Sequence, residues 1–331
     1  MDEKQLISVV IPTHNRKSSL KDCLDSVLSQ YYPSGEYEVI VVDDGSTDGT
    51  KRFLKEFTKT NSNVKFFSQP NRGPSAARNL GIEKSSGGII CFIDDDCIPE
   101  KDWLKNLVKG FDCEKVGGVG GKIITNKPST LTQRYVEESG ILNQEGFGSR
   151  KLLITGNVAY KRDALIKSGG FDTSLNACED IDLSIRVQLL GYGIKYVDNA
   201  IVYHEYRPSI IGLYRQQYRN AKGYARLNKK YPMYFSPLYN LISYSYRLVG
   251  KIISYPFFLL STLLRKGKDK KYYAIKPLLD ALVLTAFVIG MITEPLLGKK
   301  YSRWEKEGKI SFLKEQSFKT FLNKLFDKNK Y

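Results

Sequence analysis

Cysteine is scarce in this sequence, and the number and spacing of the cysteines argue against stabilisation by disulfides or by zinc. The 331 residues contain five cysteines, an odd number without a CxxC pair, so a disulfide framework and a zinc site are both excluded. We expect buried thiols in a reducing compartment at Cys23, Cys91, Cys97, Cys113 and Cys178. The first residues, Met1–Gln5, are polar and lack the apolar core of a secretory signal peptide. We therefore expect the front of the chain to stay in the cytoplasm.

Acidic residues are scarce in the last part of the chain. Residues 207–331 contain 25 basic and 7 acidic residues, a net charge of +18, whereas residues 1–206 contain 26 basic and 28 acidic residues. The overall charge of +16 thus comes from the back, which predicts an anionic partner there, either a membrane surface or nucleic acid. With 42% hydrophobic and 12% aromatic residues, the chain is not intrinsically disordered.

The front of the chain alternates short apolar runs with helical patterns. The predicted strands are residues 7–11, 39–42, 64–67, 89–93, 194–197 and 200–203. The predicted helices are residues 18–30, 48–60, 74–84 and 178–190. Because the first four strands are apolar throughout, we expect an α/β fold whose mainly parallel, Rossmann-like sheet has helices on both faces. Polar residues that follow the strands should gather at the carboxyl edge of that sheet, where open α/β folds bind ligands.

Three consecutive carboxylates, Asp94–Asp96, end one predicted strand and are the sharpest local signal. Neighbouring carboxylates repel one another unless a cation or hydrogen-bond donors compensate, and such clusters suit Mg²⁺ or Mn²⁺. The other interpretation is a solvated acidic turn, and the motif alone leaves both open. Taken singly, Asp43–Asp44 are typical turn formers, Glu179–Asp180 are typical helix caps, and His204 is a structural histidine.

The ordered set of motifs is more specific than any one of them. The segments are SVVIPTHNR at 8–16, VVDDGSTD at 41–48, NRGPSAARN at 71–79, FIDDD at 92–96, GGFD at 169–172 and EDIDLSIR at 179–186. Together they resemble the family 2 glycosyltransferases, which are inverting sugar transferases with a GT-A fold. The resemblance covers about residues 6–204, which implies a GT-A catalytic domain at 1–206.

The resemblance implies a role for each matching residue. Donor nucleotide binding is implied for Pro12, Thr13, Asn15, Arg16, Asp43, Asp44, Arg78, Asp94 and Asp95. Asp96 and His204 are the implied ligands of a divalent metal, Mn²⁺ or Mg²⁺, and Asp180 is the implied general base. The physical chemistry agrees, because inverting transfer needs a base for the acceptor proton and a Lewis acid on the departing diphosphate.

A further set of residues is expected to face the acceptor or the diphosphate. Its members are Thr155, Gly156, Asn157, Glu179, Gln216 and Arg219. The segment 216–220, QQYRN, has the frame of the QxxRW motif of processive relatives such as the cellulose synthases, with Asn220 in place of the tryptophan. That departure favours the addition of a single sugar over polymer synthesis. The alternative for this stretch is an ordinary solvated charged helix.

Behind residue 206 the sequence predicts a basic interface helix at 207–235, hydrophobic helices at 236–298 and a basic cytoplasmic tail at 299–331. Arg215, Arg219, Lys222, Arg226 and Lys230 recur at helical spacing and are expected to form one basic stripe. Residues 238–264 and 277–297 are apolar enough to associate with a membrane, but a simple hairpin would place the basic segment 265–271 outside, against the positive-inside rule. Interfacial or re-entrant helices, or a soluble helical core, are the alternatives.

These features predict a metal-dependent glycosyltransferase at the cell membrane, with its catalytic domain in the cytoplasm. It would move one sugar from a UDP- or GDP-sugar to a polyprenyl-phosphate-linked or other lipid-linked glycan. Anionic lipid is favoured over nucleic acid as the partner of the basic back, because long apolar runs interrupt the charges. The rival functions are a nucleotidyltransferase on a similar fold and a non-catalytic membrane adaptor that binds sugar nucleotides.

Overall fold

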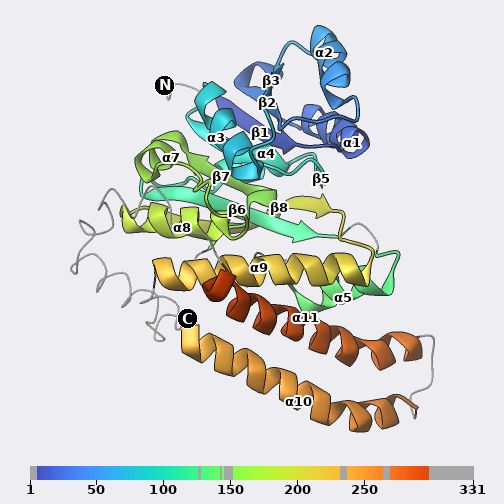
Figure 1. Ribbon diagram of the computed structural model, residues 1–331. Helices are drawn as coiled ribbons and strands as arrows, with labels where there is room; N and C mark the ends of the chain where they lie inside the picture. Colours follow the sequence, from blue (N-terminus) through green and yellow to red (C-terminus); the bar gives the residue numbers. More distant parts are fainter. Residues whose placement is uncertain are drawn as a thin grey trace.

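A computed structural model describes residues 6–125, 128–141, 144, 152–231, 237–263 and 269–297. Figure 1 shows an α/β domain built around one sheet, with three long helices stacked beneath it. The predicted tail at 299–331 lies outside the described residues.

The first half of the domain is a run of parallel strands joined by helices. Its strands are β1 (Ile7–Thr13), β2 (Tyr37–Asp43), β3 (Val64–Ser68) and β4 (Ile89–Phe92). Its helices are α1 (Lys17–Leu28), α2 (Thr50–Thr60) and α3 (Pro74–Lys84). The predicted strands and helices of this half are confirmed, each within a few residues at its ends.

The second half turns the sheet into a mixed one. Its strands are β5 (Cys97–Pro99), β6 (Val116–Ile124), β7 (Val158–Lys161) and β8 (Gly193–His204). Its helices are α4 (Trp103–Lys109), α5 (Leu131–Ser139), α7 (Arg162–Ser168) and α8 (Glu179–Leu189). The strand order in the described sheet is β3-β2-β1-β4-β7-β6-β8-β5, with antiparallel pairing of β7 to both neighbours and of β5 to β8. The two short strands predicted at 194–197 and 200–203 form the single strand β8.

The sheet is buried on both faces, which explains the uninterrupted apolar runs of its first strands. On one face Val9 and Ile11 pack with side chains of α1, α2 and α4, among them the fully buried Trp103. On the other face Val10 and Ile40 pack with side chains of α3, α7 and α8. Four of the five cysteines are buried free thiols as predicted, but Cys113 is exposed because it lies in the connection before β6.

Three helices follow the sheet domain and lie in layers beneath it. They are α9 (Ile210–Lys230), α10 (Pro237–Leu263) and α11 (Lys270–Leu297). Figure 1 places α11 between α9, which touches the sheet domain, and α10, which is outermost. Only one helix of the described residues, over 270–294, is long and apolar enough to cross a membrane.

The predicted basic stripe of α9 is only in part a free basic surface. Lys222 and Arg226 both pair with Glu294 of α11, at 3.2 and 2.5 Å. Lys230 is 6% exposed and pairs with Asp172 and Asp182 of the sheet domain. The helical spacing was therefore right, but three of its five cations bind carboxylates of this chain and not lipid phosphates.

Candidate functional site

Polar residues that follow β1, β2 and β4 meet at the carboxyl edge of the sheet, as predicted. They line a cavity of about 1160 Å³ that continues past α8 to the space between α9, α10 and α11. Of the predicted site residues, the cavity is lined by Pro12, Thr13, Arg16, Asp44, Arg78, Asp94, Asp95, Asp96, Thr155, Gly156, Glu179, Asp180, His204, Gln216 and Arg219. Asn15, Asp43 and Asn157 are not among the lining residues.

Arg78 of α3 joins two of the acids at the cavity wall. Its guanidinium donates to Asp94 Oδ1 at 2.8 Å and to Glu179 Oε1 at 2.9 Å, and its side chain is only 5% exposed. Despite its burial, these two carboxylates raise its pKa, so the side chain is a fixed cation. Asp94 follows β4 in the first half of the domain, and Glu179 begins α8 in the second half. Arg78 therefore links the two halves of the domain at the cavity wall.

Asp95 is bound to residues at the end of β1 and just after it. It accepts hydrogen bonds from Thr13 Oγ1 at 2.7 Å and from Arg16 Nη1 at 3.0 Å. Burial raises the pKa of its carboxyl to about 6, although Arg16 opposes the shift. Asp95 therefore ties β1 to the acidic turn, whereas its neighbours carry the more open carboxylates.

Asp96 and His204 form the pair best suited to hold a divalent metal. Asp96 Oδ1 lies 3.3 Å from His204 Nε2, and Arg16 contacts the other carboxylate oxygen. Within the described part of the chain, Nδ1 of His204 is buried without a hydrogen-bond partner. The Cys97 sulfur lies close by, but burial raises the pKa of its thiol well above the usual range, so it stays protonated. The pairing of β5 with β8 places Cys97 opposite His204 and brings this oxygen-and-nitrogen donor set together.

Asp180 lies in the first turn of α8, on another part of the cavity wall. Its carboxylate accepts from the backbone N–H groups of Ile181, at 2.8 Å, and Thr155. Burial raises the pKa of Asp180 to about 7, and the nearby charge of Glu179 adds to the shift. A carboxyl that titrates near neutral pH is a suitable general base. A Cβ built on Gly156 would lie 3.6 Å from Asp94 Oδ2, so the turn at 155–157 connects Asp180 with the acidic cluster.

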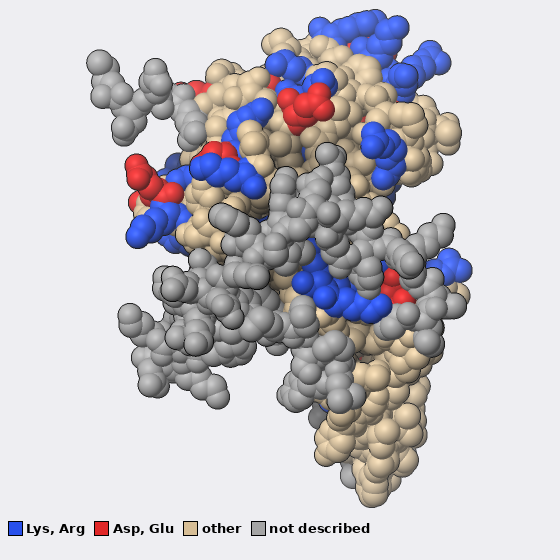
Figure 2. Space-filling view, turned by 60° about the vertical axis from the view of Figure 1, so that its left-hand side comes forward, with Lys and Arg blue, Asp and Glu red and all other residues tan. Residues whose placement is uncertain are grey.

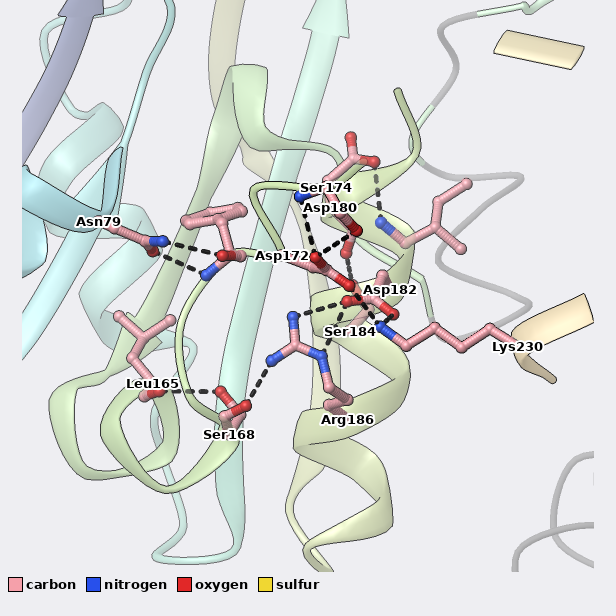
Figure 3. A network of polar contacts seen from close by, with 12 residues as sticks. Asn79, Leu165, Ser168, Asp172, Ser174, Asp180, Asp182, Ser184, Arg186 and Lys230 are labelled. Atoms are coloured by element: carbon pink, nitrogen blue, oxygen red, sulfur yellow. Dashed lines mark hydrogen bonds and ion pairs between the residues drawn. The ribbon is translucent and has the colours of Figure 1, made fainter. Parts of the chain in front are cut away.

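A buried polar network fixes the helix that carries Asp180 (Figure 3). Asp182, a fully buried residue of the first turn of α8, binds Arg186 at 2.7 Å and Lys230 of α9 at 2.7 Å. Lys230 also pairs with Asp172 at 2.8 Å, and Ser184 donates to the carbonyl of Asp180 at 2.9 Å. The acids of the segment 179–186 are thus divided between the cavity wall and this structural network.

Two predicted site residues, Asn157 and Asp43, make contacts within the protein and do not line the cavity. Asn157 is fully buried, donates to the carbonyls of Lys122 and Ala200, and accepts from the indole of Trp103. Asp43 is 1% exposed and caps its own turn by accepting from Ser46 N–H. Asn157 and Asp43 are not among the residues that line the cavity, and their expected contacts with substrate stay predictions.

The loops that follow β1 and β2 at one end of the cavity depend on two further side chains. Asn15, with φ of 54°, accepts from Thr47 N–H at 2.7 Å and so fastens the end of β1 to the loop after β2. It therefore acts within the loop and not on the cavity wall. Asp44 accepts from the backbone N–H groups of Arg72 and Gly73, both at 2.8 Å, which positions the loop before α3.

The sequence missed several residues that the fold brings to the cavity. Arg207 follows β8, and its pKa is lowered by burial and by the positive charges of Arg16 and Arg219. Such a cluster of cations beside Asp96 can receive an anionic diphosphate. Gln217 is 2% exposed, and its Nε2 has no partner among the described residues. The only available signal for Arg207 was its position, three residues after His204 and at the beginning of the basic part of the chain, and none pointed to Gln217 over Gln216.

Two family models match the sequence. The model of glycosyl transferase family 2 matches residues 8–169, and that of glycosyl transferase family group 2 matches residues 89–293, more than half of the chain. The chain belongs to glycosyl transferase family 2. It is a glycosyltransferase with the GT-A fold, as the ordered motifs implied.

Similar proteins from several organisms match about two thirds of the chain. Glycosyltransferase AglE of Haloferax volcanii is 34% identical over 66% of this chain and 72% of its own length. The probable glycosyltransferase YdaM of Bacillus subtilis is 36% identical over 67% of this chain. Poly-beta-1,6-N-acetyl-D-glucosamine synthase of Staphylococcus epidermidis is 33% identical over 66% of this chain. The chain spans only 56% and 54% of the length of the last two.

Solved structures share the fold at low sequence identity. The mannosyltransferase PcManGT of Pyrobaculum calidifontis, in complex with GDP-Man and Mn²⁺, has a TM-score of 0.57 and 18% identity, covering 99% of this chain and 89% of its own. Residues 1–349 of S. aureus TarS give a TM-score of 0.50 at 18% identity, with coverage of 90% and 93%. These likenesses concern the fold alone.

Proposed function

We propose that this chain transfers a single sugar from a UDP- or GDP-sugar to a lipid-linked acceptor at the cytoplasmic face of the cell membrane. The observation that carries the proposal is that the candidate metal ligands and the candidate base lie on different parts of the cavity wall. Asp96, His204 and Arg207 lie at one part, Asp180 lies at another, and the turn at 155–156 runs between them. A single displacement needs this separation, because the leaving diphosphate and the attacking hydroxyl lie on opposite sides of the sugar.

The residues of the cavity divide the work of transfer. Asp180 takes the proton from the attacking hydroxyl of the acceptor, and its pKa of about 7 allows it to be ionised at neutral pH. Arg207 and Arg219 face the diphosphate, while Gln217 offers an unused N–H donor. A divalent cation on Asp96 and His204, Mn²⁺ or Mg²⁺, would neutralise charge on the departing nucleoside diphosphate. PcManGT and the similarly folded GalNAc-T7 were both solved with Mn²⁺, which supports the choice of metal.

The lining at the far end of the cavity supports a lipid-linked acceptor. There the wall consists of aromatic and aliphatic side chains such as Tyr244, Val283 and Phe287, with Arg247 and Lys251 beside them. An acceptor that carries both an apolar chain and a phosphate matches this lining. Asn220, which also lines the cavity, stands where processive relatives have a tryptophan, and this favours a single addition.

Polymer synthesis is the second candidate, because one similar protein is named as a poly-beta-1,6-N-acetyl-D-glucosamine synthase. It predicts products of increasing length from one donor. The single-sugar proposal predicts that each acceptor gains one residue.

The first experiment identifies the by-product released from a panel of nucleotide sugars, with Mn²⁺ or Mg²⁺ and membrane lipid extract. We expect acceptor-dependent release of nucleoside diphosphate. Asp180→Asn should lower kcat by about 10² to 10⁴-fold with little change in donor binding. Asp96→Ala should instead remove the metal dependence of donor binding. Release of pyrophosphate, or undiminished transfer by both variants, would contradict the proposal.

A further inference from the structure

The position of α11 bears on how the chain meets a membrane. From Tyr272 to Glu294 the helix is about 33 Å long, close to the ~30 Å thickness of a bilayer's hydrocarbon core. Near its beginning, the ring of Tyr272 lies 4.1 Å below the guanidinium of Arg134 on α5, and Lys276 pairs with Glu138 of the same helix at 3.2 Å. The beginning of α11 is therefore attached to α5.

The other end of α11 is attached to the same domain. Glu294 pairs with Arg226 and Lys222 of α9, and Tyr218 lies within hydrogen-bond distance of Thr293 at 3.1 Å. Because α5 and α9 both pack on the catalytic domain, both ends of α11 lie on the same side of any membrane. A spanning helix must place its ends on opposite sides, so the observed packing is incompatible with a crossing by α11.

The outer helix α10 exposes apolar side chains on its outer face, whereas a surface helix of a water-soluble protein exposes polar ones there. One face carries Ile242, Tyr246, Val249, Ile253, Phe257 and Leu260, which recur every three or four residues and are each more than half exposed. Its two cations, Arg247 and Lys251, line the cavity on the inner side, where Lys251 pairs with Asp280 at 2.6 Å. In Figure 2 the lower end of the molecule, where Figure 1 places α10 and α11, is almost entirely tan.

The charges around this face fit an anionic lipid surface. The sequences of α10 and α11 contain only two carboxylates, Asp280 and Glu294, and both form ion pairs. Lys271, by contrast, is exposed at the beginning of α11, and residues 207–331 carry a net charge of +18. An apolar face without free acids, on the basic part of the chain, is typical of helices that lie in a lipid interface.

We propose that the chain binds one leaflet of an anionic membrane without crossing it, with α10 in the plane of the interface and α11 as the layer between α10 and α9. The outer face of α10 then enters the boundary between headgroups and acyl chains. Lys270 and Lys271, at the beginning of α11, then stay on the side of the catalytic domain, as the positive-inside rule requires. This proposal concerns the membrane-binding surface alone and would stand if the acceptor were of another kind.

Thiol labelling of the full chain in sealed membrane vesicles tests the topology. The exposed Cys113 of the catalytic domain reports which side that domain occupies, since the other four cysteines are buried. In a Cys113→Ser background, Lys271→Cys should react with a membrane-impermeant maleimide in the same vesicle orientation as the native Cys113. Reaction only in the opposite orientation would show that α10 crosses and would overturn the proposal.

Flotation of the purified full chain with vesicles of equal parts phosphatidylcholine and phosphatidylglycerol tests the surface itself. Ile253→Ser should weaken binding at least about ten-fold, because one isoleucine leaves the lipid. The matched control is Ile166→Ser on α7, since Ile166 is 60% and Ile253 is 64% exposed. It should leave binding unchanged. If Ile253→Ser binds vesicles normally but dissociates a soluble dimer, the face belongs to a second copy and the proposal fails.

Discussion

At the scale of single residues, the ionisation of Asp180 is set by its neighbours. Burial and the charge of Glu179 raise the pKa of its carboxyl, hydrogen bonds from Ile181 and Thr155 oppose them, and the resulting pKa is about 7. A group with a raised pKa holds its proton at acidic pH and loses it only as the pH passes that value. Asp180 can therefore act as a base only at neutral and alkaline pH.

The pH profile of transfer should show this directly. We expect kcat/KM to rise with pH through about 7, as Asp180 loses its proton. Glu179→Gln removes a neighbouring negative charge, so the ascending limb should move to lower pH. Asp112→Asn, which removes a carboxylate on the surface of the domain, should leave the limb in place. A limb that stays fixed in Glu179→Gln would show that another group controls the rate.

Which residues could be predicted depended on whether their neighbours were adjacent in the sequence. Asp94–Asp96 and Asp180 belong to local motifs, so their place at the sheet edge followed from strand and helix patterns. The partners of Arg78, by contrast, are separated from it by 16 and 101 positions. The direction of the Asn157 side chain depends on Trp103 and on two strands that meet only in the fold. Such long-range contacts leave no trace in a single sequence.

At the scale of elements, the junction of α8 with α9 is a buried ion network. Lys230 supplies the cation that two carboxylates share, and Arg186 neutralises only one of them directly. The spacing of basic residues correctly predicted a helix with a cationic stripe. It could not reveal that Asp172, Asp182 and Glu294 would take up three of those cations, since these acids come from other elements.

Removing this cation should destabilise the domain strongly. Lys230→Met leaves Asp172 and Asp182 buried with one cation fewer, so we expect the free energy of unfolding to fall by about 3–5 kcal/mol. Urea denaturation of the full chain measures the loss. Lys59→Met is the control, because Lys59 pairs with Glu56 at the same distance of 2.7 Å on the exposed surface. The network would not be structural if both variants unfolded at the same urea concentration.

At the scale of the whole molecule, the uneven charge has two separate causes. The front is close to neutral because its 28 acidic residues nearly match its 26 basic ones, and some of its acids line the catalytic cavity together with Arg16 and Arg78. In the described back, several basic side chains line the cavity or pair with carboxylates of this chain, whereas the outer face of α10 is apolar and exposed. The sequence predicted membrane association from composition, but the layering of α9, α11 and α10 required the three-dimensional structure.

The most direct test of the central claim is the mass of the product formed from a matched nucleotide sugar and membrane lipid extract. We predict that an acceptor lipid gains the mass of one sugar residue, that nucleoside diphosphate appears in equal amount, and that Asp180→Asn slows the formation of both by at least about 100-fold. A ladder of products with many sugars, or the same product formed by Asp180→Asn at an undiminished rate, would contradict the account.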